Sequence, residues 1–147
     1  MRVCDVMTKR VTAVAPTAFA RVIAQKFLDG HYSGLPVVDA ERKVIGVVTE
    51  FDVIKAIKEG KDLDAVHAQE IMSSPAICVD LDSPVEEAIQ LLTEHNFIRL
   101  PVCKDGKLEG ILARCDILKG YIEKWAPQPF IEYEHFMTAE PTERLAA

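Results

Sequence analysis

The sequence lacks an excess of positive charge. Its 17 Lys and Arg residues stand against 23 Asp and Glu residues, which gives a formal net charge of -6. Surfaces that bind a phosphate backbone normally carry a basic excess, so this balance argues against a nucleic-acid-binding protein. The chain also lacks any apolar run near the roughly 18–20 residues that a membrane helix needs, and its charged first ten residues do not resemble a secretory signal. We therefore expect a cytoplasmic protein without membrane contact.

The residue patterns of familiar active sites and metal sites are also missing. The four cysteines and four histidines form no C-x-x-C pair and show no metal-ligand spacing, so we expect passive thiols and no metal site. No Ser/His/Asp or Cys/His constellation, G-x-S-x-G elbow or Walker loop is present. We expect no catalytic residues and no enzyme activity. One alternative stays open, because Arg114 adjoins Cys115 and a neighbouring cation is typical of redox-active thiols.

The sequence contains an internal repeat of two copies. A length of 147 residues with 49% hydrophobic and 27% charged residues is typical of one globular domain or two small ones. A shift of 65 residues, reduced to 64 after one residue is lost in a turn, aligns ten identities. They are Met7 with Met72, Val14 with Val79, Gln25 with Gln90, Leu35-Pro36-Val37 with Leu100-Pro101-Val102, Lys43 with Lys107, Gly46 with Gly110, Asp52 with Asp116 and Lys55 with Lys119. We divide the chain into repeats at 1–60 and 61–122 and a tail at 123–147.

Each repeat carries the apolar spacing of helices and strands. Positions i, i+3, i+4 and i+7 are apolar from Ala20 to Phe27 and from Val85 to Leu92, which predicts one amphipathic helix per repeat. Thr17 and Ser83 are candidate caps for these helices, and Pro84 suits a first helical position. Strands are predicted at 11–14, 35–39 and 44–49 and at 76–79, 100–104 and 108–113, with second helices that open at Asp52 and Asp116.

This pattern predicts an α/β (α+β) fold of two β-α-β-β-α repeats. A unit of about 60 residues buries only about 60% of its unfolded surface and is marginal alone. We therefore expect the two copies to pack as one intramolecular pair around a shared core.

The repeated motifs resemble those of the CBS (cystathionine β-synthase) domain family, whose domains occur in tandem pairs. The resemblance covers residues 1–122. It rests on the Met-Thr and Met-Ser openings, on the Leu-Pro-Val strands, and on the Gly-x-x-Thr-x-x-Asp segment. This segment is complete from Gly46 to Asp52, whereas the second copy has Ala113 in place of the hydroxyl residue. The resemblance implies a non-catalytic regulatory module, of the Bateman type, that binds AMP, ADP, ATP or S-adenosylmethionine in clefts between the repeats and often forms homodimers.

The resemblance also implies a set of nucleotide-binding residues. Asp52 and Asp116 are candidates for the ribose hydroxyls, because a carboxylate accepts charge-assisted hydrogen bonds, and Thr49 is a candidate for a phosphate or sugar. Arg99 is a candidate phosphate ligand that could serve either cleft. The remaining candidates are Ser33, Gly34, Thr12, Ile77 and Arg114. The alternatives that stay open are simple helix capping for the two aspartates and a surface ion pair for Arg99.

The sequence supports two hypotheses about function. The first is a ligand sensor that needs no obligatory cofactor, acts through its shape or its association, and delivers its output to an effector protein. The second is a ligand-free assembly module used for dimerisation or docking. The tail holds Trp125, Phe130, Tyr133 and Phe136, and we expect this aromatic, acidic segment to pack on its own module or on a partner.

Overall fold

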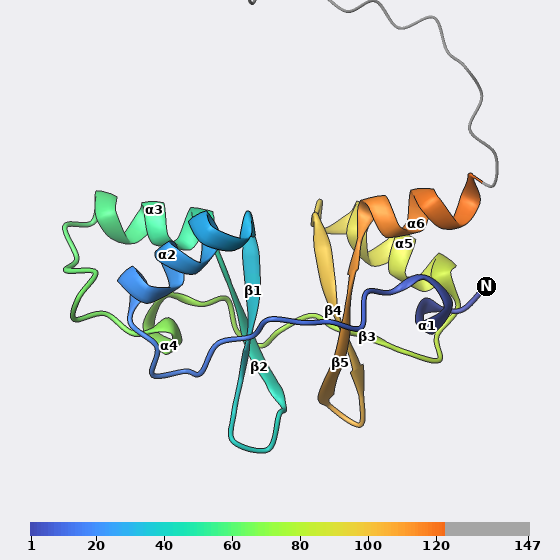
Figure 1. The fold of residues 1–147 in the computed structure, drawn as a ribbon, viewed down its shortest axis with the longest axis horizontal. Helices are drawn as coiled ribbons and strands as arrows, with labels where there is room; N and C mark the ends of the chain where they lie inside the picture. Colours follow the sequence, from blue (N-terminus) through green and yellow to red (C-terminus); the bar gives the residue numbers. More distant parts are fainter. Residues whose placement is uncertain (123–147) are drawn as a thin grey trace, which may run out of the picture.

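Two small β-sheets lie side by side near the middle of the molecule, and each is flanked by its own helices (Figure 1). The structure is a computed structural model that describes residues 1–122. The first half of the chain forms α1 (Val3–Val6), α2 (Ala20–Gly30), β1 (Gly34–Val38), β2 (Val44–Thr49) and α3 (Glu50–Lys58). The second half forms α4 (Ala68–Ile71), β3 (Val79–Asp80), α5 (Val85–Glu94), β4 (Arg99–Lys104), β5 (Lys107–Ala113) and α6 (Arg114–Tyr121).

The sheets confirm the duplicated hairpin predicted from the sequence. β1 and β2 pair antiparallel with Leu35 opposite Val48, and β4 and β5 pair antiparallel with Leu100 opposite Leu112. The predicted opening strands are much shorter than expected. The strand at 76–79 is reduced to β3, which runs parallel to β4, and the strand at 11–14 is reduced to a single bridge between Val14 and Val37.

The helices begin at other residues than the sequence predicted. α2 begins after Phe19, and α5 begins after Pro84, which takes the capping position instead of the first helical one. Thr17 and Ser83 do not cap these helices. The reason is tertiary: Ala20 donates its backbone N–H to the Val66 carbonyl at 2.8 Å, and Val85 donates its own to the Met1 carbonyl at 3.0 Å. Backbone from distant segments therefore satisfies the free N–H groups that a side-chain cap would otherwise bind.

The second helices begin two residues earlier than predicted, at Glu50 and Arg114. Asp52 and Asp116 consequently lie at the third helical position. From there each carboxylate accepts a hydrogen bond from the backbone N–H of the residue that precedes its helix. This is half of a capping box, so the sequence located the helix starts within one turn, and the two aspartates contribute to helix capping, which was the alternative left open for them.

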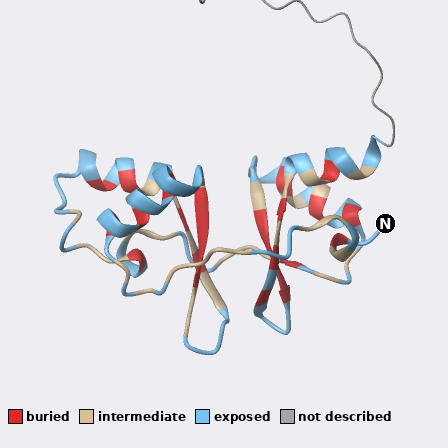
Figure 2. Cartoon of the chain, in the orientation of Figure 1, coloured by how far each residue is buried: buried red, intermediate tan, exposed pale blue. Residues whose placement is uncertain are grey.

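The buried apolar side chains form two clusters, one in each half (Figure 2). The expectation of one shared core was therefore wrong. The two clusters exchange their opening segments, because Val3 lies in the cluster of the second half and Ala68 lies in the cluster of the first half. Both side chains are fully buried. In Figure 1 the chain crosses between the halves twice, once after α1 and once after α4.

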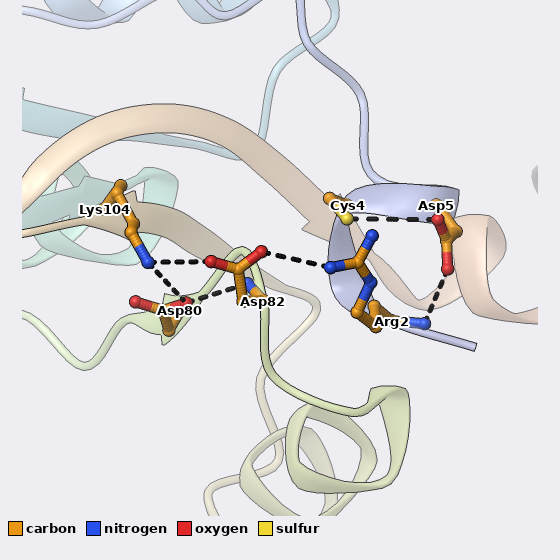
Figure 3. A network of polar contacts seen from close by, with 6 residues as sticks. All are labelled: Arg2, Cys4, Asp5, Asp80, Asp82 and Lys104. Carbon is orange, nitrogen blue, oxygen red and sulfur yellow. Dashed lines mark hydrogen bonds and ion pairs between the residues drawn. The ribbon is translucent and has the colours of Figure 1, made fainter.

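Close backbone approaches fix these exchanged segments. Thr8 bridges to Ile111 on β5, and Ser73 bridges to Val47 on β2. A polar network holds α1 on the second half (Figure 3): Asp82 accepts hydrogen bonds from Lys104 at 2.7 Å and from Arg2 at 3.4 Å. The hairpin ends are also joined, because Val44 donates its N–H to the Gly106 carbonyl at 3.1 Å. The halves are thus connected at several points along the sheets.

No helix within residues 1–122 has both the length and the apolar character needed to cross a membrane.

Candidate functional site

A pocket of about 480 Å³ lies between the two halves. Its lining from the first half comes from the start of β1 and from the junction of β2 with α3. Its lining from the second half comes from the segment before β3 and from the start of β4. Most of this lining is apolar. A concave, mostly apolar pocket with a few polar groups is the usual form of a small-molecule site.

Five of the predicted site residues line this one pocket. They are Ser33, Gly34, Thr49, Ile77 and Arg99. The strand register explains why residues so far apart in the sequence meet. Gly34 opens β1 opposite Thr49 at the end of β2, and Arg99 occupies the equivalent first position of β4 in the other half. The two repeats therefore present their corresponding corners to the same space.

Arg99 carries the site's unsatisfied polar atom. Its side chain is half-buried, and its Nε is fully buried with no hydrogen-bond partner among the described residues. Within residues 1–122 Arg99 makes no ion pair, so it is not the surface ion pair left open by the sequence. Leaving a buried donor of a charged group unpaired is costly. A ligand in the pocket would meet the rest of the guanidinium, because the Nε itself is closed off from solvent.

Thr49 is held by Asp52 at the rim of the pocket. The Asp52 carboxylate accepts a hydrogen bond from the Thr49 N–H at 2.8 Å and another from its hydroxyl at 3.0 Å. The Asp52 N–H in turn donates to the Thr49 hydroxyl oxygen at 3.3 Å. Both contacts to the carboxylate use Oδ2. Asp52 itself is not among the residues that line the pocket.

The other predicted residues are placed elsewhere. The Thr12 hydroxyl lies 3.0 Å from the Tyr32 hydroxyl, and Asp116 accepts the Ala113 N–H at 2.8 Å. Arg114 donates its Nε to the Phe97 carbonyl at 2.6 Å and its Nη2 to Asn96 Oδ1 at 3.0 Å. Arg114 therefore braces a loop that lines the pocket, and does so from an adjacent hollow.

Ten residues of the lining lie outside the predicted set, and four of these are Glu50, Phe51, Asn96 and Phe97. A signal was present for two of them, because Glu50 and Phe51 lie inside the Gly-x-x-Thr-x-x-Asp segment. Asn96 and Phe97 sit in the connection between α5 and β4, where only their position shortly before Arg99 marks them. In residues 1–122 no group of three or more His, Cys, Asp or Glu side chains is arranged to hold a metal ion.

Comparison with known families decides what this architecture is. The family model described as "CBS domain" matches the chain twice, at residues 3–59 and 68–123. The chain belongs to the CBS domain family. The two matched CBS domains correspond to the duplicated unit, and both contribute lining to the pocket.

One relative by sequence is a protein from an archaeon. The uncharacterized protein MK0525 from Methanopyrus kandleri is 39% identical over 117 residues, which are 78% of this chain and 60% of that protein. The chain thus spans less than two thirds of the length of that relative.

Two solved CBS pairs show the same fold. The crystal structure of CBSX2 in complex with AMP is 30% identical with a TM-score of 0.73, and the match covers 82% of this chain and 95% of that chain. The CBS domain pair of protein MJ0100, in complex with 5-methylthioadenosine and S-adenosyl-L-methionine, is 25% identical with a TM-score of 0.71 over 82% and 95% of the two chains.

Proposed function

We propose that this CBS pair is a regulatory module that binds an adenosine-containing ligand in the pocket between its two repeats. The observation that carries the proposal is Arg99, a half-buried residue that lines a largely apolar pocket and makes no ion pair within residues 1–122. A charged donor without an acceptor fits a site that is completed by an anionic ligand. The structures of CBSX2 with AMP and of the MJ0100 pair with S-adenosyl-L-methionine support the ligand class.

Each part of an adenosine ligand has a matching group in or beside the pocket. The guanidinium of Arg99 would bind a phosphate or carboxylate, and the Ser33 hydroxyl would donate a further hydrogen bond. The Thr49 hydroxyl already donates to Asp52, so towards a ligand it would act as an acceptor. The apolar faces of Phe97 and Ile77 would contact the adenine ring. Asp52 does not line the pocket, but it adjoins the rim at Thr49 and is the candidate for the ribose through Oδ1, since its two hydrogen bonds to Thr49 both use Oδ2.

A ligand in this pocket would touch both repeats at once, because the lining comes from both. Binding would therefore favour one relative arrangement of the two halves, and would act through shape or association. The module itself would perform no catalysis, and its output would pass to an effector protein.

Self-association is the second part of the proposal. Large apolar side chains are exposed on α3 and α6, with Phe51 at 73%, Ile54 at 63% and Leu118 at 59% exposure. α3 and α6 lie along the same edge of the molecule in Figure 1. Apolar surface of this kind marks an interaction site, and we propose that it joins two copies in a homodimer. The same surface favours the alternative function, an assembly module that docks on another protein without binding a ligand.

A thermal-shift panel separates the two functions. The full chain is heated with AMP, ADP, ATP, S-adenosylmethionine or NADH. A ligand at 100 times its Kd adds about 2.7 kcal/mol to the free energy of unfolding, which raises the melting temperature by several degrees at this size. Arg99→Gln should remove the shift, and Arg21→Gln should retain it because Arg21 is an exposed residue outside the pocket, paired with Asp64. If no ligand produces a shift, the sensing function is wrong and the assembly function is favoured.

A further inference from the structure

The described residues that line the pocket carry one positive and one negative side chain. Arg99 is the base and Glu50 is the acid, and the other lining residues are uncharged. A single guanidinium pairs well with one phosphate or one carboxylate. A second or third phosphate would need further cations, and the charge of the lining therefore bears on which adenosine ligand fits.

The neighbouring cation is already engaged. Arg114 contacts the loop at Asn96 and Phe97, and its guanidinium donates to the Phe97 carbonyl and to Asn96 Oδ1. To reach a ligand phosphate it would have to give up these contacts and release the loop that shapes the pocket.

The start of α3 adds little positive potential in place of a second cation. Of the first three backbone N–H groups of α3, that of Glu50 donates to the Ser33 carbonyl at 3.0 Å, and that of Asp52 donates to the Thr49 hydroxyl. The N–H groups that would bind a phosphate at a helix start are therefore mostly occupied. The first turn also carries two carboxylates, Glu50 and Asp52.

Glu50 is in position to repel additional phosphates. It is the first residue of α3, and its side chain is exposed. Its backbone N–H donates a hydrogen bond to the carbonyl of Ser33, the residue just before β1. Like charges brought within a few ångströms of each other at a protein surface repel strongly. A polyphosphate chain that extends from Arg99 would add negative charge beside Glu50 without gaining a cation.

We infer that this pocket selects adenosine ligands with one anionic group over adenosine di- and triphosphates, and that Glu50 is the residue that enforces the selection. The inference rests on the proposed function. The shared chemistry is an adenosine with one anionic substituent, which is a phosphate in AMP and a carboxylate in S-adenosylmethionine.

The test is calorimetric titration of the full chain with AMP, S-adenosylmethionine, ADP and ATP, without divalent cations and at fixed ionic strength. We expect AMP or S-adenosylmethionine to bind at least about tenfold more tightly than ATP, with ADP between them. Glu50→Gln should strengthen ATP binding more than AMP binding, so that the ratio of the two affinities falls at least about threefold. Glu86→Gln is the matched control, because Glu86 is an exposed acid in the first turn of α5 that does not line the pocket.

The outcomes distinguish the inference from the function beneath it. If ATP binds as tightly as the ligands with one anionic group, the inference fails while the sensing function stands. If Glu50→Gln changes the affinity ratio no more than Glu86→Gln, the role of Glu50 is wrong. If none of the four ligands binds, both the inference and the proposed function fail. If AMP and S-adenosylmethionine both bind, the ratio of their affinities shows whether the pocket prefers a phosphate or a carboxylate.

Discussion

The Asp52 carboxylate accepts hydrogen bonds from both the backbone N–H and the hydroxyl of Thr49, at 2.8 and 3.0 Å. This pair forms the capping box of α3 and at the same time sets the Thr49 side chain at the rim of the pocket. The second repeat keeps only half of the arrangement. Asp116 accepts the Ala113 N–H at 2.8 Å, but the Ala113 methyl group offers no acceptor to the helix.

Exchanging the capping residues should shift stability in opposite directions. Thr49→Ala removes a side-chain cap and should lower the free energy of unfolding by about 1 kcal/mol, whereas Ala113→Thr supplies the missing cap and should raise it by up to about 1 kcal/mol. Urea unfolding of both variants without ligand measures the two changes. An Ala113→Thr variant no more stable than the natural chain would contradict the capping interpretation of the second repeat.

Gly46 and Gly110 are required by the close passage of the exchanged segments. A Cβ at Gly46 would meet the Met72 sulfur and would lie 2.8 Å from the Ser73 carbonyl oxygen. At Gly110 a Cβ would lie 2.8 Å from the Met7 sulfur and 2.9 Å from the Thr8 carbonyl oxygen. Gly46 thus contacts Met72, and Gly110 makes the equivalent contact with Met7. Both contacts join the two repeats, which accounts for the identity of these residues in the two copies.

Alanine at either glycine should therefore destabilise the fold. The facing atoms include backbone, which cannot move aside as a side-chain tip can, so we expect each substitution to lower the free energy of unfolding by about 1–3 kcal/mol. Gly60→Asn is the control, because Gly60 has open space around it and a φ of +75° that Asn tolerates. Denaturant unfolding measures all three variants. Equal effects at Gly46 and Gly60 would mean that the contacts with the crossing segment are not limiting.

The opening segment should stabilise the opposite repeat. Val3 is fully buried in the cluster of the second half, and its N–H donates to the Ser83 carbonyl at 2.9 Å. Val3→Ala should lower the free energy of unfolding by about 1.5–3 kcal/mol. Val22→Ala, at a side chain 60% exposed on α2, should have little effect. Hydrogen exchange should locate the loss of protection from Val3→Ala in β4 and β5. Loss confined to β1 and β2 would contradict the exchange of segments.

These particular residues show where sequence reasoning succeeded and where it could not. The strand at 44–49 was predicted with its observed bounds, because its apolar run and the turn that precedes it are local properties. The capping of α2 was mispredicted because its N–H groups bind the carbonyls of Leu63 and Val66, which are distant in the sequence. The single shared core was wrong for the same reason, since apolar periodicity identifies buried faces but not the element that covers them.

The candidate site was predictable in part. Motif matching placed Thr49 and Arg99 in one set, and the structure brings both to one pocket. It could not show that Thr49 lines the pocket while Asp52 does not. A spacing of three residues in the sequence does not reveal which of the two side chains faces the cavity. Ribose binding by Asp52 and Asp116 therefore stays a prediction.

Cys78 and Cys103 form a pair of thiols with opposite titration behaviour. The parallel register of β3 and β4 places Asp80 opposite Cys103, which brings Cys78 and Cys103 to neighbouring positions. A hydrogen bond from the Cys103 thiol lowers the pKa of Cys78, although burial opposes this. The same contact, together with burial, raises the pKa of Cys103. The Cys78 thiolate is thus favoured by a donor that itself stays protonated.

The pH dependence of alkylation should report this pair. Because thiolate is the reactive form, the midpoint of Cys78 labelling by iodoacetamide should lie below the ordinary thiol value, and Cys103, only 7% exposed, should label last. Cys103→Ala removes the donor and should raise the pH midpoint of Cys78 labelling. This midpoint does not depend on any change in the overall labelling rate that a more exposed Cys78 would cause. Cys115→Ser is the matched control, because it removes an exposed thiol. Peptide mass spectrometry across pH 6–10 resolves each site, and an unchanged Cys78 midpoint in Cys103→Ala would show that the two thiols are not coupled.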